Sequence, residues 1–140
     1  IANGAILSLE RVTLREGSAN GYGGGGLFIR RGEVSLVDCT IERCSGRSGG
    51  GLLVANDATL DAKGCVFVDN TAAHGGAAVA VRDRARVTLR SCSFVGQQRP
   101  AGAGDGPGWL IDATLSSGAK AVSLEDCTLP AVRDGALRLS

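Results

Sequence analysis

The sequence predicts an all-β fold, a single-stranded parallel β-helix or solenoid of about five coils with about 27 residues each. Three observations predict it: an internal repeat, a period-two alternation of apolar residues within each repeat, and a glycine cluster at a fixed place in most repeats. The composition agrees, because 22 glycines and 4% aromatic residues are unsuited to a conventional core of large side chains. The length of 140 residues favours one domain over 1–140.

The repeat is found by aligning the chain on its cysteines. Five segments share one pattern: LSLERVTL (7–14), VSLVDCTI (34–41), LDAKGCVF (60–67), VTLRSCSF (87–94) and VSLEDCTL (122–129). Positions 1, 3, 6 and 8 are apolar in all five copies, which random placement would produce with a probability of about 10⁻⁷. The aligned sixth positions lie 27, 26, 27 and 35 residues apart, so the last interval carries an insertion of about eight residues.

Each segment predicts two short strands joined by a bend. Apolar and polar residues alternate, slip in phase once at the fourth and fifth positions, and then alternate again. Period two is typical of a strand, and the slip indicates the bend. A third strand is expected after each glycine cluster, in GGGLFIR (24–30), GGGLLVA (49–55), GGAAVAV (75–81), PGWLIDA (107–113) and GALRLS (135–140).

A unit of three short strands cannot bury its apolar face alone. It becomes stable when units stack, with each strand pairing with its copies at a spacing of about 4.8 Å. The repetition therefore predicts the architecture itself. Within it, Gly49, Gly50, Gly75 and Gly76 are expected at tight corners, because glycine adopts positive φ at little cost.

One stretch carries a family resemblance. Phe67-Val68-Asp69-Asn70 followed by Gly75-Gly76-Ala77 resembles the paired FxxN and GGA[ILV] repeat of polymorphic outer membrane proteins and related autotransporter passengers. More broadly, the chain is similar to the pectin-lyase-like β-helix superfamily. The resemblance implies a right-handed helix, in agreement with the usual hand of parallel crossovers, and an extracellular or cell-surface setting. It also implies that Asn70 is a structural turn residue whose amide bonds the backbone of neighbouring coils.

Cys39, Cys65, Cys92 and Cys127 share one inward position, so we expect a column of stacked thiols. The main interpretation is a buried structural column of small side chains. Two alternatives stay open: a disulfide, in which the fifth cysteine, Cys44, could take part, and a metal site. We expect no metal and no cofactor, since the chain has no CxxC pair and its one histidine, His74, lies in a turn.

The outward columns decide between a binding protein and an enzyme. The column Ser8, Ser35, Asp61, Thr88, Ser123 holds a single carboxylate, and the column Glu10, Val37, Lys63, Arg90, Glu125 mixes signs as solvated pairs do. A glycosidase needs two carboxylates at a defined separation, and none can be assembled from the sequence. We therefore expect no catalytic residue. A third column, Thr13, Thr40, Val66, Ser93 and Thr128, is one residue wide and indicates β-propensity more than ice binding.

The insertion, taken as a loop over residues 97–108 and ending beside the only tryptophan, is the predicted contact loop. Loops on a rigid scaffold often carry recognition, and tryptophan is a common interface anchor. The residues assigned to this contact are Arg99, Pro100, Asp105 and Trp109.

The function expected is a non-enzymatic structural or binding β-helix, either a surface passenger or a scaffold subunit of a larger assembly. The alternative is a carbohydrate-active lyase or hydrolase. Expected partners are other protein subunits, or the rest of a longer chain, at the open coil ends, with carbohydrate as a further candidate. A net charge of +1 gives no indication of nucleic acid, and no apolar run is long enough to span a membrane.

Overall fold

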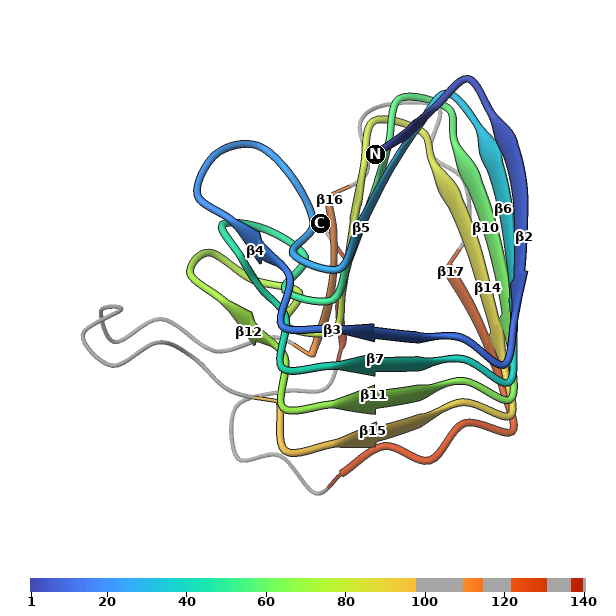
Figure 1. Cartoon of the computed structure of the whole chain (residues 1–140), viewed down its shortest axis with the longest axis vertical. Helices are drawn as coiled ribbons and strands as arrows, with labels where there is room; N and C mark the ends of the chain where they lie inside the picture. The colour runs from blue at the N-terminus through green and yellow to red at the C-terminus, as the bar shows by residue number, and fades with distance from the viewer. Residues whose placement is uncertain (98–109, 115–121, 131–136, 140) are drawn as a thin grey trace.

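The protein is a parallel β-solenoid. The computed structural model describes residues 1–97, 110–114, 122–130 and 137–139, and within these ranges every regular element is a β-strand. Figure 1 shows the chain winding into coils that stack one on another, each strand lying beside its counterpart in the next coil. The predicted all-β, parallel architecture is confirmed.

Four parallel sheets, here called A to D, run along the stack. Sheet A contains β1 Ala2–Asn3, β5 Leu27–Arg30, β9 Leu52–Ala55, β13 Val79–Arg82, β16 Ile111–Thr114 and β18 Leu137–Leu139. Sheet B contains β2 Ile6–Glu10, β6 Glu33–Val37, β10 Thr59–Lys63, β14 Arg86–Arg90 and β17 Val122–Glu125. Sheet C contains β3 Thr13–Arg15, β7 Thr40–Glu42, β11 Val66–Val68 and β15 Ser93–Val95, and sheet D contains β4 Ser18–Ala19, β8 Ser45–Gly46 and β12 Thr71–Ala72.

The strand register confirms the repeat. Leu7 pairs with Val34, Val34 with Leu60 and Leu60 with Val87, so successive coils are 27, 26 and 27 residues long. Val87 pairs with Val122, which gives the predicted interval of 35. The outward columns that begin at Ser8, Glu10 and Thr13 follow the same register.

One detail of the prediction is corrected. Each complete coil has four strands and not three, since the two-residue strands of sheet D were not predicted. Within the described residues, three coils contribute to all four sheets, a fourth contributes to sheets A, B and C, and β16 and β17 belong to a further, partly described coil, so the coil count is near the predicted five.

The register also divides the eight extra residues of the last interval. Phe67 to Val79 spans 12 residues, whereas the paired positions Phe94 to Ile111 span 17, which places five extra residues before β16. The other three fall between β16 and β17.

The bends between strands are made by single residues in the left-handed region. The fifth position of the repeat, where the phase slips, has φ of 50–64° in every coil; these residues are Arg11, Asp38, Gly64, Ser91 and Asp126. A second set turns sheet C toward sheet D: Glu16, Arg43, Asp69 and Gly96. One residue at positive φ reverses the inward and outward sense of the alternation, and Asp, Asn and Gly tolerate that conformation best.

The core is the space enclosed by sheets A, B and C. In the inner coils the four apolar positions of the repeat are at most 4% exposed, as in Leu60, Ala62, Cys65 and Phe67. Phe67 and Phe94 stack in adjacent coils with ring centroids 4.9 Å apart and planes 9° apart. In the first coil the same positions, Leu7 and Leu9 among them, are only partly buried, because no described strand lies beyond β2.

The outer face of sheet A is buried as well. Its outward residues Leu53 and Ala80 are fully buried. The glycine loops lie against the backbone here, since a Cβ on Gly24 would sit 2.4 Å from Leu53 N and one on Gly76 would sit 2.9 Å from Ala80 Cα. These loops, which follow β4 and β12, bulge to the left of sheet A in Figure 1.

In the described part of the chain, no helix is long and apolar enough to cross a bilayer.

The left-handed bends make a stability prediction. Ser91→Gly should raise the free energy of unfolding by about 0.5 to 1 kcal/mol, because glycine has no Cβ to clash at φ 50°. Ser93→Gly, two residues later in strand β15, should lower it by a similar amount, because glycine weakens extended backbone. Urea unfolding of the two variants measures the difference, and a change of the same sign in both would contradict the bend assignment.

Candidate functional site

The four repeat cysteines lie along the bend between sheets B and C, on the inner side of the backbone. Cys39, Cys65 and Cys92 are at most 1% exposed, and Cys127 is half-buried. Each thiol lies 3.3–3.6 Å from two carbonyl oxygens, one two residues earlier in its own coil and one in the preceding coil. The column therefore links coils through weak S–H donors.

The pKa values of two adjacent column thiols shift in opposite directions, because the hydrogen bond between Cys65 and Cys92 lowers the pKa of the Cys92 thiol. The hydrogen bond with Cys92 and, next, burial raise the pKa of the Cys65 thiol far above its ordinary value. Burial likewise raises the pKa of the Cys44 thiol. All five cysteines are free thiols, and among the described residues no three histidine, cysteine, aspartate or glutamate side chains come together as metal ligands would. Cys39, Cys65 and Cys92 are thus buried among apolar side chains and hydrogen-bonded to backbone carbonyl groups.

A second polar column lies at the bend between sheets C and D. Asn70, fully buried, accepts a hydrogen bond from Cys44 N at 3.0 Å and donates one to Ile41 O at 2.9 Å, both in the preceding coil. Gln97 repeats the arrangement one coil later, accepting from Asn70 N at 3.2 Å and donating to Phe67 O at 2.7 Å.

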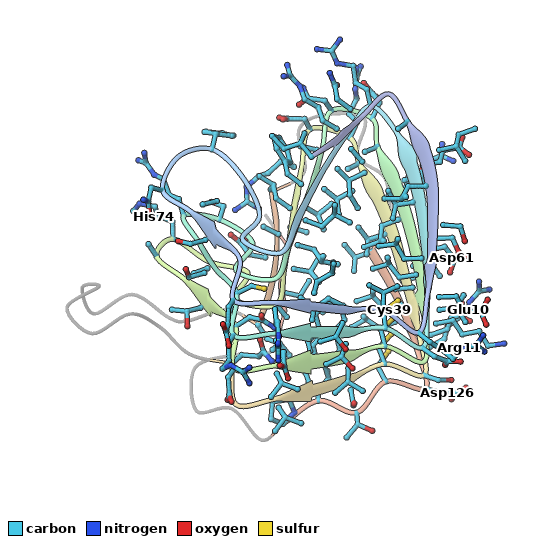
Figure 2. The ribbon with its side chains drawn as sticks, in the orientation of Figure 1. Glu10, Arg11, Cys39, Asp61, His74 and Asp126 are labelled. Carbon is cyan, nitrogen blue, oxygen red and sulfur yellow. The ribbon has the colours of Figure 1, made fainter. Side chains whose placement is uncertain are left out.

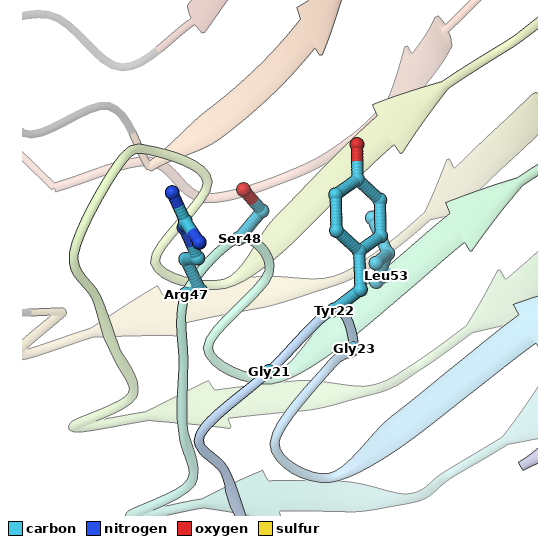
Figure 3. A pocket seen from close by; sticks show the side chains of 6 residues that line it. All are labelled: Gly21, Tyr22, Gly23, Arg47, Ser48 and Leu53. Carbon is cyan, nitrogen blue, oxygen red and sulfur yellow. The ribbon is translucent and has the colours of Figure 1, made fainter.

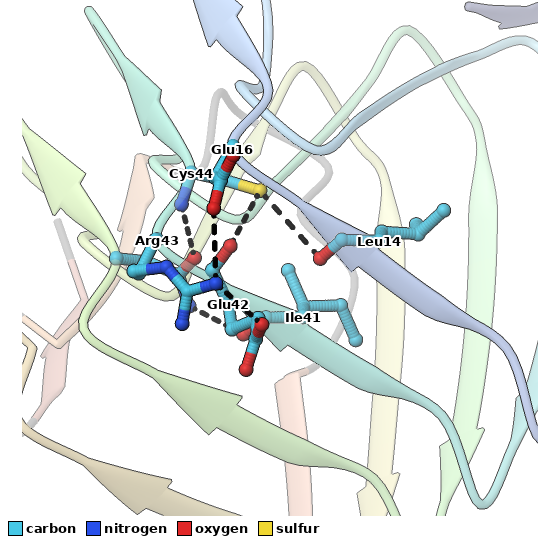
Figure 4. Close-up of polar contacts among 7 residues, drawn as sticks. Leu14, Glu16, Ile41, Glu42, Arg43 and Cys44 are labelled. Atoms are coloured by element: carbon cyan, nitrogen blue, oxygen red, sulfur yellow. Dashed lines mark hydrogen bonds and ion pairs between the residues drawn. The ribbon is translucent and has the colours of Figure 1, made fainter.

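Cys44 takes the same place one coil earlier. Figure 4 shows its sulfur directed at the carbonyl oxygens of Glu42 and Leu14, which lie 3.3 and 3.8 Å away. Gln97 has a glutamine where Asn70 has an asparagine, and its amide makes the same kind of contacts with the preceding coil.

The predicted corner glycines divide into two kinds. Gly49, Gly75 and Gly76 have positive φ, as expected. Gly50 has no positive φ; instead a Cβ there would lie 2.4 Å from Thr71 O and 2.5 Å from Ala77 O of the next coil. Gly50 is therefore required by the close approach of two coils and not by its dihedral angle.

The charged side chains of the outer faces pair mostly between coils. Arg43 binds Glu16 at 3.0 Å, Arg84 binds Asp57 at 2.9 Å, and Arg90 binds Asp61. Figure 2 shows Asp61 and Glu10 outside sheet B, with Arg11 and Asp126 at its lower bend and Cys39 on the inner side.

A groove opens on the opposite side of the molecule, between the loop 20–26 and the loop 47–51 of the next coil. It has a volume of about 230 Å³ and is lined by Gly21, Tyr22, Gly23, Arg47, Ser48 and Leu53. Figure 3 shows Arg47 and Tyr22 on two sides of it with Ser48 between them, and the tyrosine ring in front of Leu53. The loops differ in length, with seven residues at 20–26, five at 47–51 and six at 73–78, so the first loop projects beyond the second.

Tyr22 and Arg47 are the exposed groups of this groove. The Tyr22 side chain is 82% exposed. Arg47 is exposed too, and no carboxylate of the described residues lies within ion-pair distance of it. His74, also exposed, is adjacent, because its backbone N–H donates to Arg47 O at 2.9 Å. The groove therefore combines an aromatic ring with a cation that has no ion-pair partner among the described residues.

Sequence reasoning placed recognition elsewhere. The proposed contact residues Arg99, Pro100, Asp105 and Trp109 lie outside the described residues. Tyr22 was missed, although a signal was present: it is the only tyrosine, and it stands in the glycine run NGYGGGG (20–26). An aromatic side chain between glycines has little local structure to pack against, which indicates a ring available to a partner.

The amide column makes a second prediction. Asn70→Ala should lower the free energy of unfolding by about 2 to 4 kcal/mol, because Cys44 N–H and Ile41 C=O lose their partner inside the molecule. Asn3→Ala, an exposed change of the same type, should stay within about 0.5 kcal/mol. Both are read from urea unfolding curves, and equal midpoints for Asn70→Ala and the unaltered protein would show that these bonds do not stabilise the stack.

Comparisons with protein-family models, curated proteins and solved structures found no match to this chain. The β-solenoid architecture is thus established by the structure alone. Membership of the pectin-lyase-like superfamily, and the likeness to autotransporter passengers, stay predictions.

Proposed function

We propose that this chain is a non-enzymatic structural or binding β-solenoid, a rigid scaffold that presents its loops to another molecule. The observation that carries the proposal is the use of the outward carboxylates in ion pairs that join one coil to the next. Asp57, Asp61 and Glu16 each pair with an arginine 27 to 29 residues later in the chain. Their role in the stack supports a structural reading of the charged faces.

The most buried of these pairs joins β13 to β16. Arg82 Nη2 lies 2.7 Å from Asp112 Oδ2, and Arg82 Nη1 donates to Asp112 O at 2.8 Å and to Val81 O at 2.9 Å. The Asp112 side chain is only 3% exposed. A Cβ on Gly75 would lie 2.6 Å from Asp112 Oδ2, so the carboxylate also fills the space that the glycine leaves.

Hydrolysis of a glycosidic bond requires carboxylates that are not held in ion pairs of this kind. It needs two carboxylates that face one cleft, one to donate a proton and one to act as base or nucleophile. The shallow groove on the face of sheet B, at Ile6 and Ser35, is lined by two acids, Glu33 and Asp61, but Asp61 Oδ2 is already bound by Arg90. This arrangement favours binding or scaffolding over bond cleavage.

The finer form of the proposal follows the resemblance in residues 67–77. A surface passenger or a subunit of a larger assembly would use the rod for length and its loops for contact. Right-handed winding and a cell-surface or extracellular setting belong to the same proposal.

The ion pairs can be tested by two matched substitutions. Arg82→Met should lower the free energy of unfolding by about 3 to 5 kcal/mol, because it leaves the Asp112 carboxylate buried without its cation. Arg84→Met, which breaks an exposed pair with Asp57, should cost less than about 1 kcal/mol. Chemical denaturation measures both, and similar losses would contradict the structural role of the buried pair.

The absence of cleavage is tested directly. Incubation of the full chain with polygalacturonate and other acidic polysaccharides, with and without calcium, should release no more reducing ends or unsaturated sugars than buffer does. An active polysaccharide lyase serves as the positive control. Product release that disappears in Asp61→Asn would overturn the proposal and establish the alternative, a carbohydrate-active enzyme.

A further inference from the structure

The groove between loops 20–26 and 47–51 has exposed side chains that do not join one described coil to the next. The ion pairs, the thiol column and the amide column all join one coil to the next. The side chains of Tyr22 and Arg47 take part in none of these contacts. Tyr22 is 82% exposed, and no described carboxylate pairs with the Arg47 guanidinium. The groove therefore places an exposed aromatic ring next to a cation that no described carboxylate pairs with, a combination suited to binding a ligand.

The chemistry of the lining restricts that occupant. Arg47 can bind a carboxylate through two parallel N–H groups, and the Ser48 hydroxyl beside it can donate to the same anion. The ring of Tyr22, backed by Leu53, offers an apolar surface at small entropic cost, and its hydroxyl remains in solvent. The complementary group is therefore a carboxylate next to an apolar side chain.

The number of cations along this column of the stack favours a protein segment over a repeating polyanion as the ligand. Two residues beyond the paired positions Ser18, Ser45 and Thr71, successive coils carry Asn20, Arg47 and Ala73. A polyuronate or nucleic acid that followed the rod would present an anion to each coil and would find a cation in this column at only one of them. A single acidic side chain is matched by a single arginine.

We propose that this groove docks an acidic segment of a partner protein, with Arg47 pairing with one carboxylate and Tyr22 packing against the adjacent apolar side chain. The size agrees, because about 230 Å³ accommodates a side chain or two and not a folded element. Tyrosine and arginine are also the residues that most often dominate protein interfaces. The inference rests on the proposed binding function and names the class of partner.

The test is a titration of the full ¹⁵N-labelled chain followed by NMR. The probes are an acetylated and amidated hexapeptide of alternating glutamate and phenylalanine, its glutamine counterpart, and trigalacturonate. We expect the acidic peptide to shift the amide signals of Gly21, Tyr22, Gly23 and Ser48 and the side-chain signal of Arg47. Added salt should weaken the binding, because the ion pair is exposed.

Variants locate the interaction. Tyr22→Ala and Arg47→Gln should each weaken binding of the acidic peptide about tenfold, and Arg86→Gln, the same charge change at an exposed position on β14, should leave it unchanged. Since all three positions are exposed, thermal unfolding should be the same for every variant.

Three results would overturn the proposal: no shift in the loop 20–26, equal binding of the glutamine peptide, or tighter binding of trigalacturonate than of the acidic peptide. Each of them leaves the proposed non-enzymatic function intact, because that proposal fails only if polysaccharide is cleaved.

Discussion

The structure depends on the pairing of each coil with the coil beside it. No strand in the described part of the chain is longer than five residues, and no single coil encloses enough apolar surface to be stable. The contrast between inner and outer coils shows this directly. Leu36 and Ala62, which have a described coil on either side, are fully buried, whereas Leu9 at the same position of the first coil is only partly buried. Burial in this protein is a property of neighbouring coils and not of a strand.

Stacking in register places the bends of successive coils beside one another. At the two bends that flank sheet C, side-chain thiols and amides form hydrogen bonds between coils. The thiols of one bend and the amides of Asn70 and Gln97 at the next reach the carbonyl groups of the preceding coil. Asn70 also accepts from the backbone N–H of Cys44, which lies between strands β7 and β8. Charged residues follow the same rule on the outside, where Arg84 and Arg90 bind acids one coil earlier. A substitution at one corner is therefore felt by two coils.

The proposed docking groove lies at an irregularity of this regular frame. The stacked loops beside sheet A contain seven, five and six residues, and the difference between the first two opens the groove at Tyr22 and Arg47. Asp112 and Arg82 mark another irregularity, since their strands are 32 residues apart in register instead of 27. The ion pair of Arg82 with Asp112 joins coils at one irregularity, whereas the longer first loop leaves Tyr22 exposed at the other.

The sequence by itself determined the repeat, the strand register, the inward positions and the bend at the phase slip, because all of these follow from local alternation and a constant period. It also indicated Asn70 as a bonding amide, on the strength of a resemblance. Only the tertiary structure decided the two-residue strands of sheet D, which are too short to show a period. It alone showed that Gly50 is needed for the close approach of Thr71, and that Tyr22 stands beside Arg47, 25 residues away in sequence. Periodicity places a residue on a face of its own coil, but the distance between two coils and the relative length of their loops exist only once the chain has stacked.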